Sequence, residues 1–388
     1  MANNIFNVLD YGAVSDGGDS SAAFNAAFNA LNNNPDGGVI YIPAGNYLIQ
    51  NTIFGATNKA FEVRGEGSAS QLVLNGGNMA NGIVMQQNTA NGALEIRDLQ
   101  IYVTGATGLG NGSVLSVIGT LQGVAGLRIE NIHIRMSDDS PVSNVVLVRN
   151  PSQGVIRDLN IDGYSSWGQS NTATGLYIDC VIQGANAIQL FNVNVFRTYY
   201  GIRCIGGQIN QQYDMEGFQA TGCSCVGVQY GLVMMGGWYQ PPGYGWFGGH
   251  INAAQLCVQI NTWSEFKVQG ALLYLNSDGR NVGGTPQGFV LIQGSDDVQV
   301  KDNTCRFVNE ETGAANTPGC YGVAATNSSN VLITGNFFDI NETAGSTAVY
   351  SAGGNSNVRT AFNTARGVHA FLANSDGAAR SIGEDLAI

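Results

Sequence analysis

The clearest pattern of hydrophobic and polar positions lies near the start of the chain, between residues 20 and 33. Apolar residues there recur three and four positions apart, which places them on one face of an α-helix and leaves asparagines on the other face. The apolar face holds Ala23, Phe24, Ala27, Phe28 and Leu31, and the polar face holds Asn25, Asn29 and Asn32. The pattern predicts a short amphipathic helix with Ser20 as N-cap, because its hydroxyl can accept a hydrogen bond from a free backbone N–H.

Short strands are expected on both sides of this helix. Residues 7–13 have the pattern of a strand that ends at a glycine turn, and residues 39–49 have the pattern of two apolar strands around a Pro-Ala-Gly-Asn turn. No comparably long helical pattern follows in the sequence. One helix ahead of a long series of strands is expected for a cap on a solenoid, because the first coil must not expose its core or its edge.

Two recurring markers run along the rest of the chain. The first is an Asp or Asn between apolar residues, found at Asp98, Asn131, Asp158, Asn192, Asn303, Asn336 and Asn363. The second is a glycine before a short apolar strand, found at Gly175, Gly201, Gly231, Gly288 and Gly322. Most neighbouring markers of one kind are roughly 30 residues apart, which is the length of one coil of a β-helix.

Two markers with the same period predict one repeated unit, because a sandwich or barrel would not keep both in phase along the chain. We therefore expect an all-β fold, a parallel β-helix, with a strand and capping helix at 1–34, the solenoid at 35–372 and a tail at 373–388. The tail is interpreted as a loose end or an assembly contact. The recurring asparagines are expected to stack at the turns and form a ladder of side-chain hydrogen bonds.

The N-terminal segment resembles that of the pectate lyase superfamily of right-handed β-helices, which includes many phage tailspike depolymerases. Residues 6–14, the turn at Asp16 and Gly17, the Ala-rich helix and residues 37–49 carry the resemblance. It implies a single-stranded right-handed β-helix and, as in β-helix tailspikes, a homotrimer. It does not select a reaction, because proteins with this segment include lyases, glycoside hydrolases, uronate epimerases and non-catalytic binders. Ser20 and Ser21 stand where the superfamily usually has acidic residues, a departure that concerns helix capping.

Composition narrows the choice of partners. Of the 388 residues, 54 are glycine and only 11% are charged, which suits stacked coils better than helical surface. The formal net charge of -12 and the lack of a basic stripe argue against a nucleic-acid partner. No apolar run has the length of a membrane span. An acidic substrate would need local arginine or lysine, or a bound cation.

The seven cysteines show no CxxC pair and no regular spacing, so we interpret most of them as small apolar residues of the core. A thiol-rich chain that needs no disulfides is expected to fold in a reducing cytoplasm. Residues 1–20 lack the basic and apolar regions of a secretory signal peptide. These features fit a protein that is carried on a virion tail or acts outside the cell after release by lysis.

Aromatic residues concentrate between residues 160 and 265, and the segment 236–250 is too rich in glycine and proline for a regular coil. We expect this segment to bulge as a loop that offers flat ring faces to sugars. The alternative is that the rings cover an apolar core beneath the loop or between subunits. The candidate substrate-binding rings are Trp167, Tyr199, Tyr213, Trp238, Tyr239 and Trp246.

The expected phase of the coils brings three polar side chains together. Alternation along the strand that begins at Gly175 sends Leu176 and Ile178 inward and leaves Tyr177 and Asp179 outside. Arg203 occupies the matching outward position one coil later, about 4.8 Å away. We expect Tyr177, Asp179 and Arg203 to position a substrate, although an Asp–Arg pair across strands also occurs as plain surface complementarity.

Asp214 and Glu216 are the strongest candidates for catalysis. On a strand they share one face at roughly 6–7 Å, which suits the acid and base of an inverting glycosidase. The same two carboxylates are also compatible with a bound calcium ion in a lyase, or with a solvated strand face. Asp139 in an Asp-Asp pair at a coil turn and Glu265 beside Trp263 are further candidates.

Motifs of familiar chemistries are missing from the sequence. Polygalacturonases, which the resemblance includes, carry Asn-Thr-Asp, Asp-Asp, Gly-His-Gly and Arg-Ile-Lys motifs in successive coils. Here Asp138 and Asp139 supply an Asp-Asp pair, but the other three motifs do not accompany it. Three histidines and scattered cysteines assemble no metal cluster, and we expect no cofactor apart from calcium in the lyase alternative. The sequence therefore favours a glycoside hydrolase that cleaves inside a polysaccharide, resembling a tailspike depolymerase. The alternatives are a calcium-dependent polysaccharide lyase and a non-catalytic glycan-binding or attachment protein.

Overall fold

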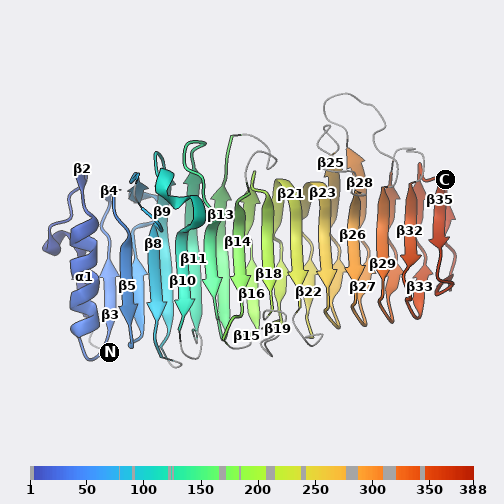
Figure 1. Cartoon of the computed structure of the whole chain (residues 1–388), viewed down its shortest axis with the longest axis horizontal. Helices are drawn as coiled ribbons and strands as arrows, with labels where there is room; N and C mark the ends of the chain where they lie inside the picture. Colours follow the sequence, from blue (N-terminus) through green and yellow to red (C-terminus); the bar gives the residue numbers. More distant parts are fainter. Residues whose placement is uncertain are drawn as a thin grey trace.

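The chain forms one parallel β-solenoid whose coils stack along a single long axis (Figure 1). The computed structural model describes residues 4–77, 79–89, 92–120, 124, 126–165, 172–182, 185–206, 215–236, 242–276, 287–308, 320–340 and 346–388. Helix α1 (Ser21–Asn33) lies at one end and the C-terminus at the other. The predicted right-handed parallel β-helix with an N-terminal capping helix is confirmed.

A full coil contributes one strand to each of three parallel sheets, which we name S1, S2 and S3 in chain order. S1 contains β1 (Ile5–Asn7), β3 (Gly38–Tyr41), β6 (Phe61–Arg64), the first halves of β9 (Leu94–Val103), β11 (Leu127–Met136) and β13 (Gly154–Asp162), β16 (Ile188–Phe191), β20 (Gln219–Thr221), β22 (Gly245–Phe247), β24 (Lys267–Gln269), β27 (Gln299–Lys301), β30 (Leu332–Thr334), β33 (Val358–Ala361) and β36 (Ala379–Ser381).

S2 follows S1 within each coil. It contains β2 (Asp16–Asp19), β4 (Gly45–Ile49), β7 (Ser70–Leu74), the second halves of β9, β11 and β13, β17 (Asn194–Phe196), the first halves of β21 (Ser224–Met235) and β23 (His250–Asn261), β25 (Leu272–Asn276), β28 (Thr304–Val308), β31 (Phe337–Asp339), β34 (Thr364–Arg366) and β37 (Leu386–Ala387).

S3 closes the coil. It contains β5 (Ile53–Thr57), β8 (Ile83–Gln87), β10 (Ser113–Gly119), β12 (Asn144–Arg149), β14 (Thr174–Asp179), β18 (Tyr200–Ile205), the second halves of β21 and β23, β26 (Gly288–Gln293), β29 (Tyr321–Thr326), β32 (Thr347–Ala352) and β35 (Ala370–Asn374). Three short 3₁₀ helices, η1 (Val8–Tyr11), η2 (Gly67–Ala69) and η3 (Thr107–Asn111), and the paired strands β15 (Ala185–Asn186) and β19 (Met215–Glu216) lie in the connections.

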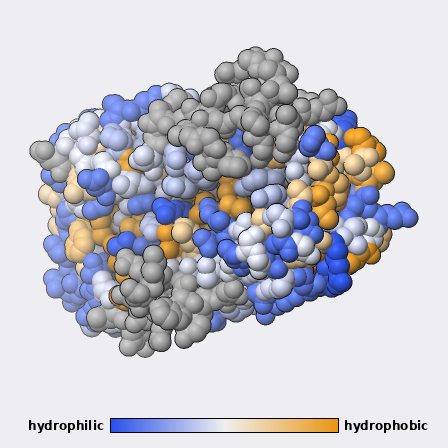
Figure 2. Space-filling model, turned by 45° about the vertical axis from the view of Figure 1, so that its right-hand side comes forward, coloured by the Kyte–Doolittle hydropathy of each residue, from blue (hydrophilic) through white to orange (hydrophobic). Residues whose placement is uncertain are grey.

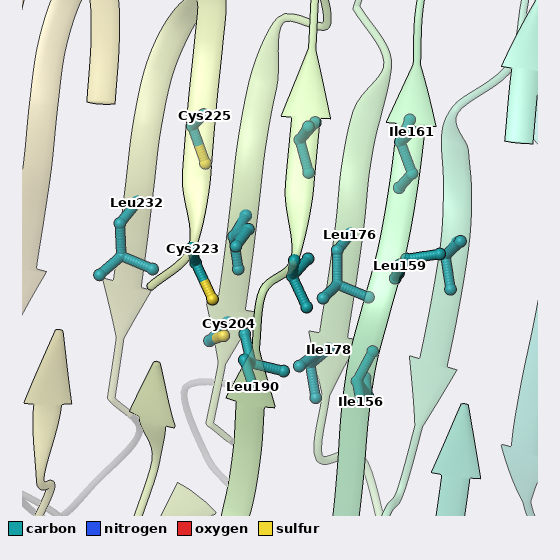
Figure 3. Close-up of a cluster of buried hydrophobic side chains, with 14 of the residues drawn as sticks. Ile156, Leu159, Ile161, Leu176, Ile178, Leu190, Cys204, Cys223, Cys225 and Leu232 are labelled. Carbon is teal, nitrogen blue, oxygen red and sulfur yellow. The ribbon is translucent and has the colours of Figure 1, made fainter. Parts of the chain in front are cut away.

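Side chains that alternate inward along each strand form the core, where equivalent positions stack from coil to coil (Figure 3). Leu176 stacks with Ile202 and then Leu232, while Ile178 stacks with Cys204, and all of these side chains are buried. The seven cysteines are all buried, which confirms their interpretation as core residues. Burial raises the pKa of six of these thiols, to about 11 at Cys223, so the six remain protonated at neutral pH; they belong to Cys204, Cys223, Cys225, Cys257, Cys305 and Cys320.

The Asn and Asp markers lie at the turn between S1 and S2, where a single left-handed residue bends the chain. Asp98, Asn131, Asp158 and Asn192 take φ values of 58°, 52°, 52° and 51°, which asparagine and aspartate tolerate better than most residues. Asn131 Nδ2 donates to Asp98 Oδ1 at 2.7 Å, and Asn192 repeats this bond to Asp158. The predicted ladder is thus confirmed on the outside of these turns.

A second ladder lies inside the solenoid. Asn303, Asn336 and Asn363 occupy the position after the left-handed residue and are buried. Each side chain hydrogen-bonds to the next one along the ladder at 2.9 Å, and Asn363 continues it to Asp385. The recurring marker of the sequence therefore includes two structurally distinct positions.

Helix α1 occupies the place of an S3 strand in the first coil and packs on β5. Its five predicted apolar residues are buried, as expected. The predicted role of Ser20 is wrong, because its hydroxyl exchanges hydrogen bonds with the backbone of Val14, whereas Asp19 accepts from the N–H of Ser21. Residues 7–13 are also not a single strand, since β1 ends at Asn7 and η1 follows.

Two further expectations differ from the structure. Part of the supposed loop at 236–250 is regular, because β22 belongs to S1 and β23 begins at His250. Residues 373–388 are not a separate tail, since β36 pairs with β33 and β37 pairs with β34.

Hydrophobic residues gather at the end that holds these last coils, the right-hand end of Figure 2. They include the exposed Ile382, Leu386 and Ile388.

Candidate functional site

Five side chains on the outer side of S3 form a compact group, which we call the tyrosine–arginine cluster. It consists of Tyr177, Tyr199, Tyr200, Arg203 and Tyr230. Strand register creates it, because Tyr177 on β14 pairs with Arg203 on β18, and Tyr200 pairs with Tyr230. The guanidinium carbon of Arg203 lies 4.9 Å from the ring centroid of Tyr200 and 5.6 Å from that of Tyr177. The predicted proximity of Tyr177 and Arg203 is confirmed.

The rings of the cluster also pack on one another. Tyr200 stacks on Tyr230 with centroids 5.2 Å apart, and Tyr199 meets the edge of Tyr200 at 4.8 Å. Burial raises the pKa of Tyr177, and that of Tyr230 to about 12, so both phenols remain hydrogen-bond donors at neutral pH. Arg203 Nε is buried without a hydrogen-bond partner within the described structure. The cluster therefore presents a cation between aromatic faces, a combination that suits sugar rings.

Asp179 belongs to a different contact from the one predicted. Its carboxylate pairs with Arg149 of the preceding coil, with Arg149 Nη2 2.8 Å from Asp179 Oδ2 and Arg149 Nε 3.1 Å from both oxygens. Only 4% of Asp179 is exposed. Burial raises its pKa, while the bonds from Arg149 act in the opposite direction. Both oxygens accept hydrogen bonds from Arg149, which favours a structural role for Asp179 beside the cluster over the predicted role at the substrate.

Asp139 has a structural role at the turn between S2 and S3. Its side chain accepts hydrogen bonds from the hydroxyls of Ser137 and Ser140 and from the backbone N–H of Gly105. These bonds, above all the one from Ser137, lower its pKa. A carboxylate held by these bonds is better suited to stabilising a turn than to donating a proton. This argues against the predicted catalytic role of Asp139.

The other candidate carboxylates lie at the opposite edge of S3, where the turns lead back to S1. Glu216 and Glu265 line a groove of about 750 Å³ together with Asp297, and all three are exposed. We call it the turn groove. Its lining also includes Asn186, Tyr244, Phe247, Lys267, Gln299, Asn330, Leu332 and Arg359. The structure thus brings Glu216 and Glu265 into one groove and places Tyr177, Tyr199 and Arg203 on S3.

Successive coils repeat one left-handed position along this groove. Glu265, Asp297 and Asn330 have φ values of 54°, 52° and 51°. Bridges from Ser264 to Asp296 and then to Ser329 place the following residues one coil apart. Neighbouring coils are about 4.8 Å apart, so the carboxylates of Glu265 and Asp297 leave the backbone at adjacent positions. Asp297 was not among the candidates from the sequence, where Asp296 and Asp297 have the pattern of a plain turn.

The aromatic residues predicted to bind sugar lie in different environments in the structure. Trp246 is wrong as a sugar-binding ring, because it points into the core between Ala220 and Val268 and is 0% exposed. Tyr199 is half-buried within the cluster. Tyr200 and Tyr230 were not singled out as one group, although their spacing of one coil already predicts that they stack. The remaining predicted site residues lie outside the described part of the chain; they are Asp214, Trp167, Tyr213, Trp238 and Tyr239.

A second groove, of about 770 Å³, lies over S2 and is lined by amides and by His133, Asp162, Phe196 and Arg197. Among the residues that the structure describes, no three His, Cys, Asp or Glu side chains are grouped closely enough to hold a metal ion. Calcium binding therefore stays an untested expectation. The described part of the chain also contains no helix with the length and hydrophobicity of a membrane span.

Comparison with known families agrees with this architecture. The sequence model of the family described as rhamnogalacturonase A/epimerase, pectate lyase-like, matches residues 5–223, more than half of the chain. Rhamnogalacturonase A of Aspergillus niger is 30% identical over 160 residues, which are 40% of this chain and 32% of that protein. Probable rhamnogalacturonase B of Neosartorya fischeri is 32% identical over 149 residues, 38% of this chain and 25% of that protein. The aligned region spans a third or less of these relatives.

Solved structures show the same fold at low sequence identity. The A-module of mannuronan C-5 epimerase AlgE4 from Azotobacter vinelandii gives a TM-score of 0.59 at 16% identity, over 97% of this chain and 100% of that one. The pre-mature bacteriophage phi29 gene product 12 gives 0.58 at 14% identity, over 98% of this chain and 55% of that one. The superfamily resemblance predicted from the N-terminal segment is confirmed.

Proposed function

Because the chain belongs to the rhamnogalacturonase A/epimerase family of pectate lyase-like proteins, we propose that it is a polysaccharide-degrading enzyme that cleaves internal glycosidic bonds. One observation carries the proposal for this chain itself, namely the tyrosine–arginine cluster. On a protein with a net charge of -12, Arg203 is held between the rings of Tyr177 and Tyr200 and pairs with no carboxylate among the residues that the structure describes. This arrangement favours a sugar ring, which stacks on the tyrosines and accepts hydrogen bonds from them.

We assign hydrolysis to Asp214 and Glu216, as the sequence predicts. Glu216 is exposed on β19, in the connection that leads from β18 of S3 to β20 of S1. One carboxyl group would protonate the departing oxygen and the other would activate water, the division of labour of inverting glycosidases. In this assignment the tyrosine–arginine cluster positions the glycan, and Glu216 acts on it from the connection after β18, together with Asp214.

A lyase reaction is the main alternative within the same class of substrate. It would abstract a proton next to a uronate carboxyl group and leave an unsaturated end, with calcium or cationic side chains to neutralise the charge. The turn groove supports hydrolysis instead, because it supplies Glu216, Glu265 and Asp297 in one open space. A chelator separates the two cases, since it would inactivate the calcium-dependent lyase and leave the hydrolase active.

We further propose that the protein acts outside the producing cell, as part of a virion tail or after release, and that it works as a homotrimer. Both proposals rest on the resemblance to tailspike depolymerases. Size-exclusion chromatography with light scattering tests the trimer, and a monomer at micromolar concentration would contradict it.

The activity test uses rhamnogalacturonan, polygalacturonate and a set of bacterial capsular polysaccharides, with reducing ends and ultraviolet absorbance followed together. Asp214→Asn and Glu216→Gln should abolish turnover, because each removes a proton donor or acceptor. Glu384→Gln is a matched control, since Glu384 is an exposed carboxylate near the C-terminus. Full activity in both site variants would contradict the assignment of these carboxylates. Binding without cleavage by the wild-type protein would favour a glycan-binding attachment protein.

A further inference from the structure

The turn groove has the shape of a channel for an extended chain. Its floor is one row of S1 side chains, because Lys267, Gln299, Leu332 and Arg359 pair in register on four successive coils. Its edge is the row of left-handed residues that includes Glu265, Asp297 and Asn330. Both rows run along the solenoid axis at about 4.8 Å per coil. A linear polymer lying along the axis would therefore meet one side chain from each row at each coil of the groove.

Tyr244 provides a ring at one end of this channel. The side chain is 57% exposed, and the ring lies against Gly217, where a Cβ atom would come within 3.3 Å of Tyr244 Cε2. Gly217 and Gly243 occupy the edge position in the coils before Glu265, so small residues leave the face of the groove open there. An exposed ring beside an open polar channel is a typical contact for the CH face of a sugar.

Several charged groups of the lining can bind a ligand. Among the described residues, Glu265, Asp297 and Lys267 form no ion pair, although all three are exposed. The amide of Gln299 stands beside them, whereas the amide of Asn330 already donates to Asp296 and accepts from Asn357. Arg359 Nε is buried and has no hydrogen-bond partner within the described structure, so a hydroxyl group entering the groove can satisfy it.

The charge balance selects among linear polymers. Three carboxylates face two cations in this lining, on a chain with a net charge of -12, so a polyanion would be repelled. An apolar peptide would find too few large apolar side chains, since Tyr244, Phe247 and Leu332 stand among charges and amides. A neutral, hydroxyl-rich chain fits best, because carboxylates and amides accept from hydroxyls and the ring covers a sugar face.

We propose that the turn groove is a binding groove for an extended, uncharged segment of a glycan chain. This inference rests on the proposed function, since Glu216 stands at one end of the groove. A chain held along the coils passes that carboxylate in mid-chain, which favours cleavage of internal bonds. Tyr244, Asp297 and Arg359 then hold a part of the glycan chain that lies away from the part bound at the tyrosine–arginine cluster.

The test compares Tyr244→Ala with Tyr350→Ala, because Tyr350 is also an exposed tyrosine, at 39%, but lies on β32 of S3. Native gels cast with galactan, dextran, rhamnogalacturonan or polygalacturonate measure binding without turnover. Loss of the Tyr244 ring should weaken binding of a neutral or mixed glycan about tenfold, corresponding to about 1.4 kcal/mol. Asp297→Asn is a second variant that keeps the fold, since Asn330 already occupies the equivalent position one coil later.

The outcomes separate this inference from the proposed function. Cleavage by the wild type, with binding equal in Tyr244→Ala, Asp297→Asn and Tyr350→Ala, would overturn the groove and leave the enzyme assignment intact. Preferential binding of polygalacturonate would also overturn it, because the charge argument requires a neutral segment. A wild-type protein that neither binds nor cleaves any glycan would overturn both proposals. The groove is supported if only the two groove variants lose retardation and require higher substrate concentrations for cleavage.

Discussion

The buried asparagine ladder predicts a large cost for a single substitution at Asn336. Its side chain is 1% exposed and takes part in four hydrogen bonds to neighbouring coils. Nδ2 donates to the backbone oxygen of Val300 and to Asn363 Oδ1, both at 2.9 Å. Oδ1 accepts from the backbone N–H of Asn303 at 3.0 Å and from its Nδ2 at 2.9 Å.

Asn336→Ala removes all four of these bonds. The backbone N–H of Asn303 and the backbone oxygen of Val300 lose this partner, whereas Asn363 Oδ1 still accepts from the backbone N–H of residue 336 and Asn303 Nδ2 still donates to Val268. An unsatisfied buried donor or acceptor costs about 1–3 kcal/mol, and water that enters the vacated space recovers part of the loss. We expect a decrease of about 3–5 kcal/mol in the free energy of unfolding, in the range of the most damaging single substitutions. The loss should concentrate in the coils around residues 300–366, because each coil of a solenoid is stabilised chiefly by its neighbours.

The assay is urea unfolding followed by tryptophan fluorescence, together with amide hydrogen exchange read by mass spectrometry. Asn131→Gly is the matched control, because Asn131 also donates to its ladder neighbour but lies on the exposed side of the turn. Glycine accepts the φ of 52° at this position, so the control should cost about 1 kcal/mol or less. Equal losses in the two variants, or a loss below about 1 kcal/mol for Asn336→Ala, would refute the reasoning.

Three further predictions concern titration, thiols and binding. Although burial alone raises the pKa of Asp19, hydrogen bonds from Ser21, Gln50 and Asn51 lower it below its usual value. Its contribution to stability should therefore be complete above pH 4 or so and disappear as the pH falls through that lowered pKa, and Asp19→Asn should flatten this part of the acid-unfolding curve. The seven buried thiols should not react with Ellman's reagent in the native protein but should all react in denaturant, and rapid native labelling would contradict their burial. Arg203→Ala should weaken glycan binding about tenfold and Arg203→Lys less, measured by the same affinity gels, whereas unchanged binding in both would exclude the cluster as a glycan site.

The β-solenoid fold could be predicted from the sequence because every coil repeats the same pattern of residues. The inward positions of Leu176, Ile178, Ile202 and Cys204 follow from alternation within each strand and from one coil length between strands. The asparagine markers recur because the turn between S1 and S2 needs a left-handed residue or an inward hydrogen-bonding amide. Because each coil has the same local requirements, the same residue types recur once per coil, and the coil length can be read from this one sequence.

The error at Trp246 has a physical cause. Glycine-rich sequence suggested a loop, but Gly245 lies within β22, where a Cβ atom would be 2.0 Å from the backbone oxygen of Lys267. The glycine permits a close approach between coils at a φ of 126°, and Trp246 then points inward. Composition alone does not distinguish a glycine that frees a loop from one that lets two strands approach.

The candidate site was only partly accessible for a similar reason. Tyr177 and Arg203 lie one coil apart and could be paired by phase, and their contact is present. Asp179 was predicted to join Arg203 but pairs with Arg149 of the preceding coil, a choice that depends on side-chain geometry. In the turn groove, Glu265 and Asp297 lie one coil apart at equivalent positions, but Glu216 precedes the equivalent residue, Gly217, two coils before Glu265, so no single spacing links the three carboxylates.

The most direct test of the central claim is a time course of wild-type protein with each polysaccharide of the panel, followed by reducing-end assay and by absorbance of unsaturated uronates. We predict that reducing ends appear without new absorbance, that viscosity falls early because cleavage is internal, and that a chelator changes neither. Reducing ends that rise together with absorbance and vanish with the chelator would contradict hydrolysis and establish a calcium-dependent lyase.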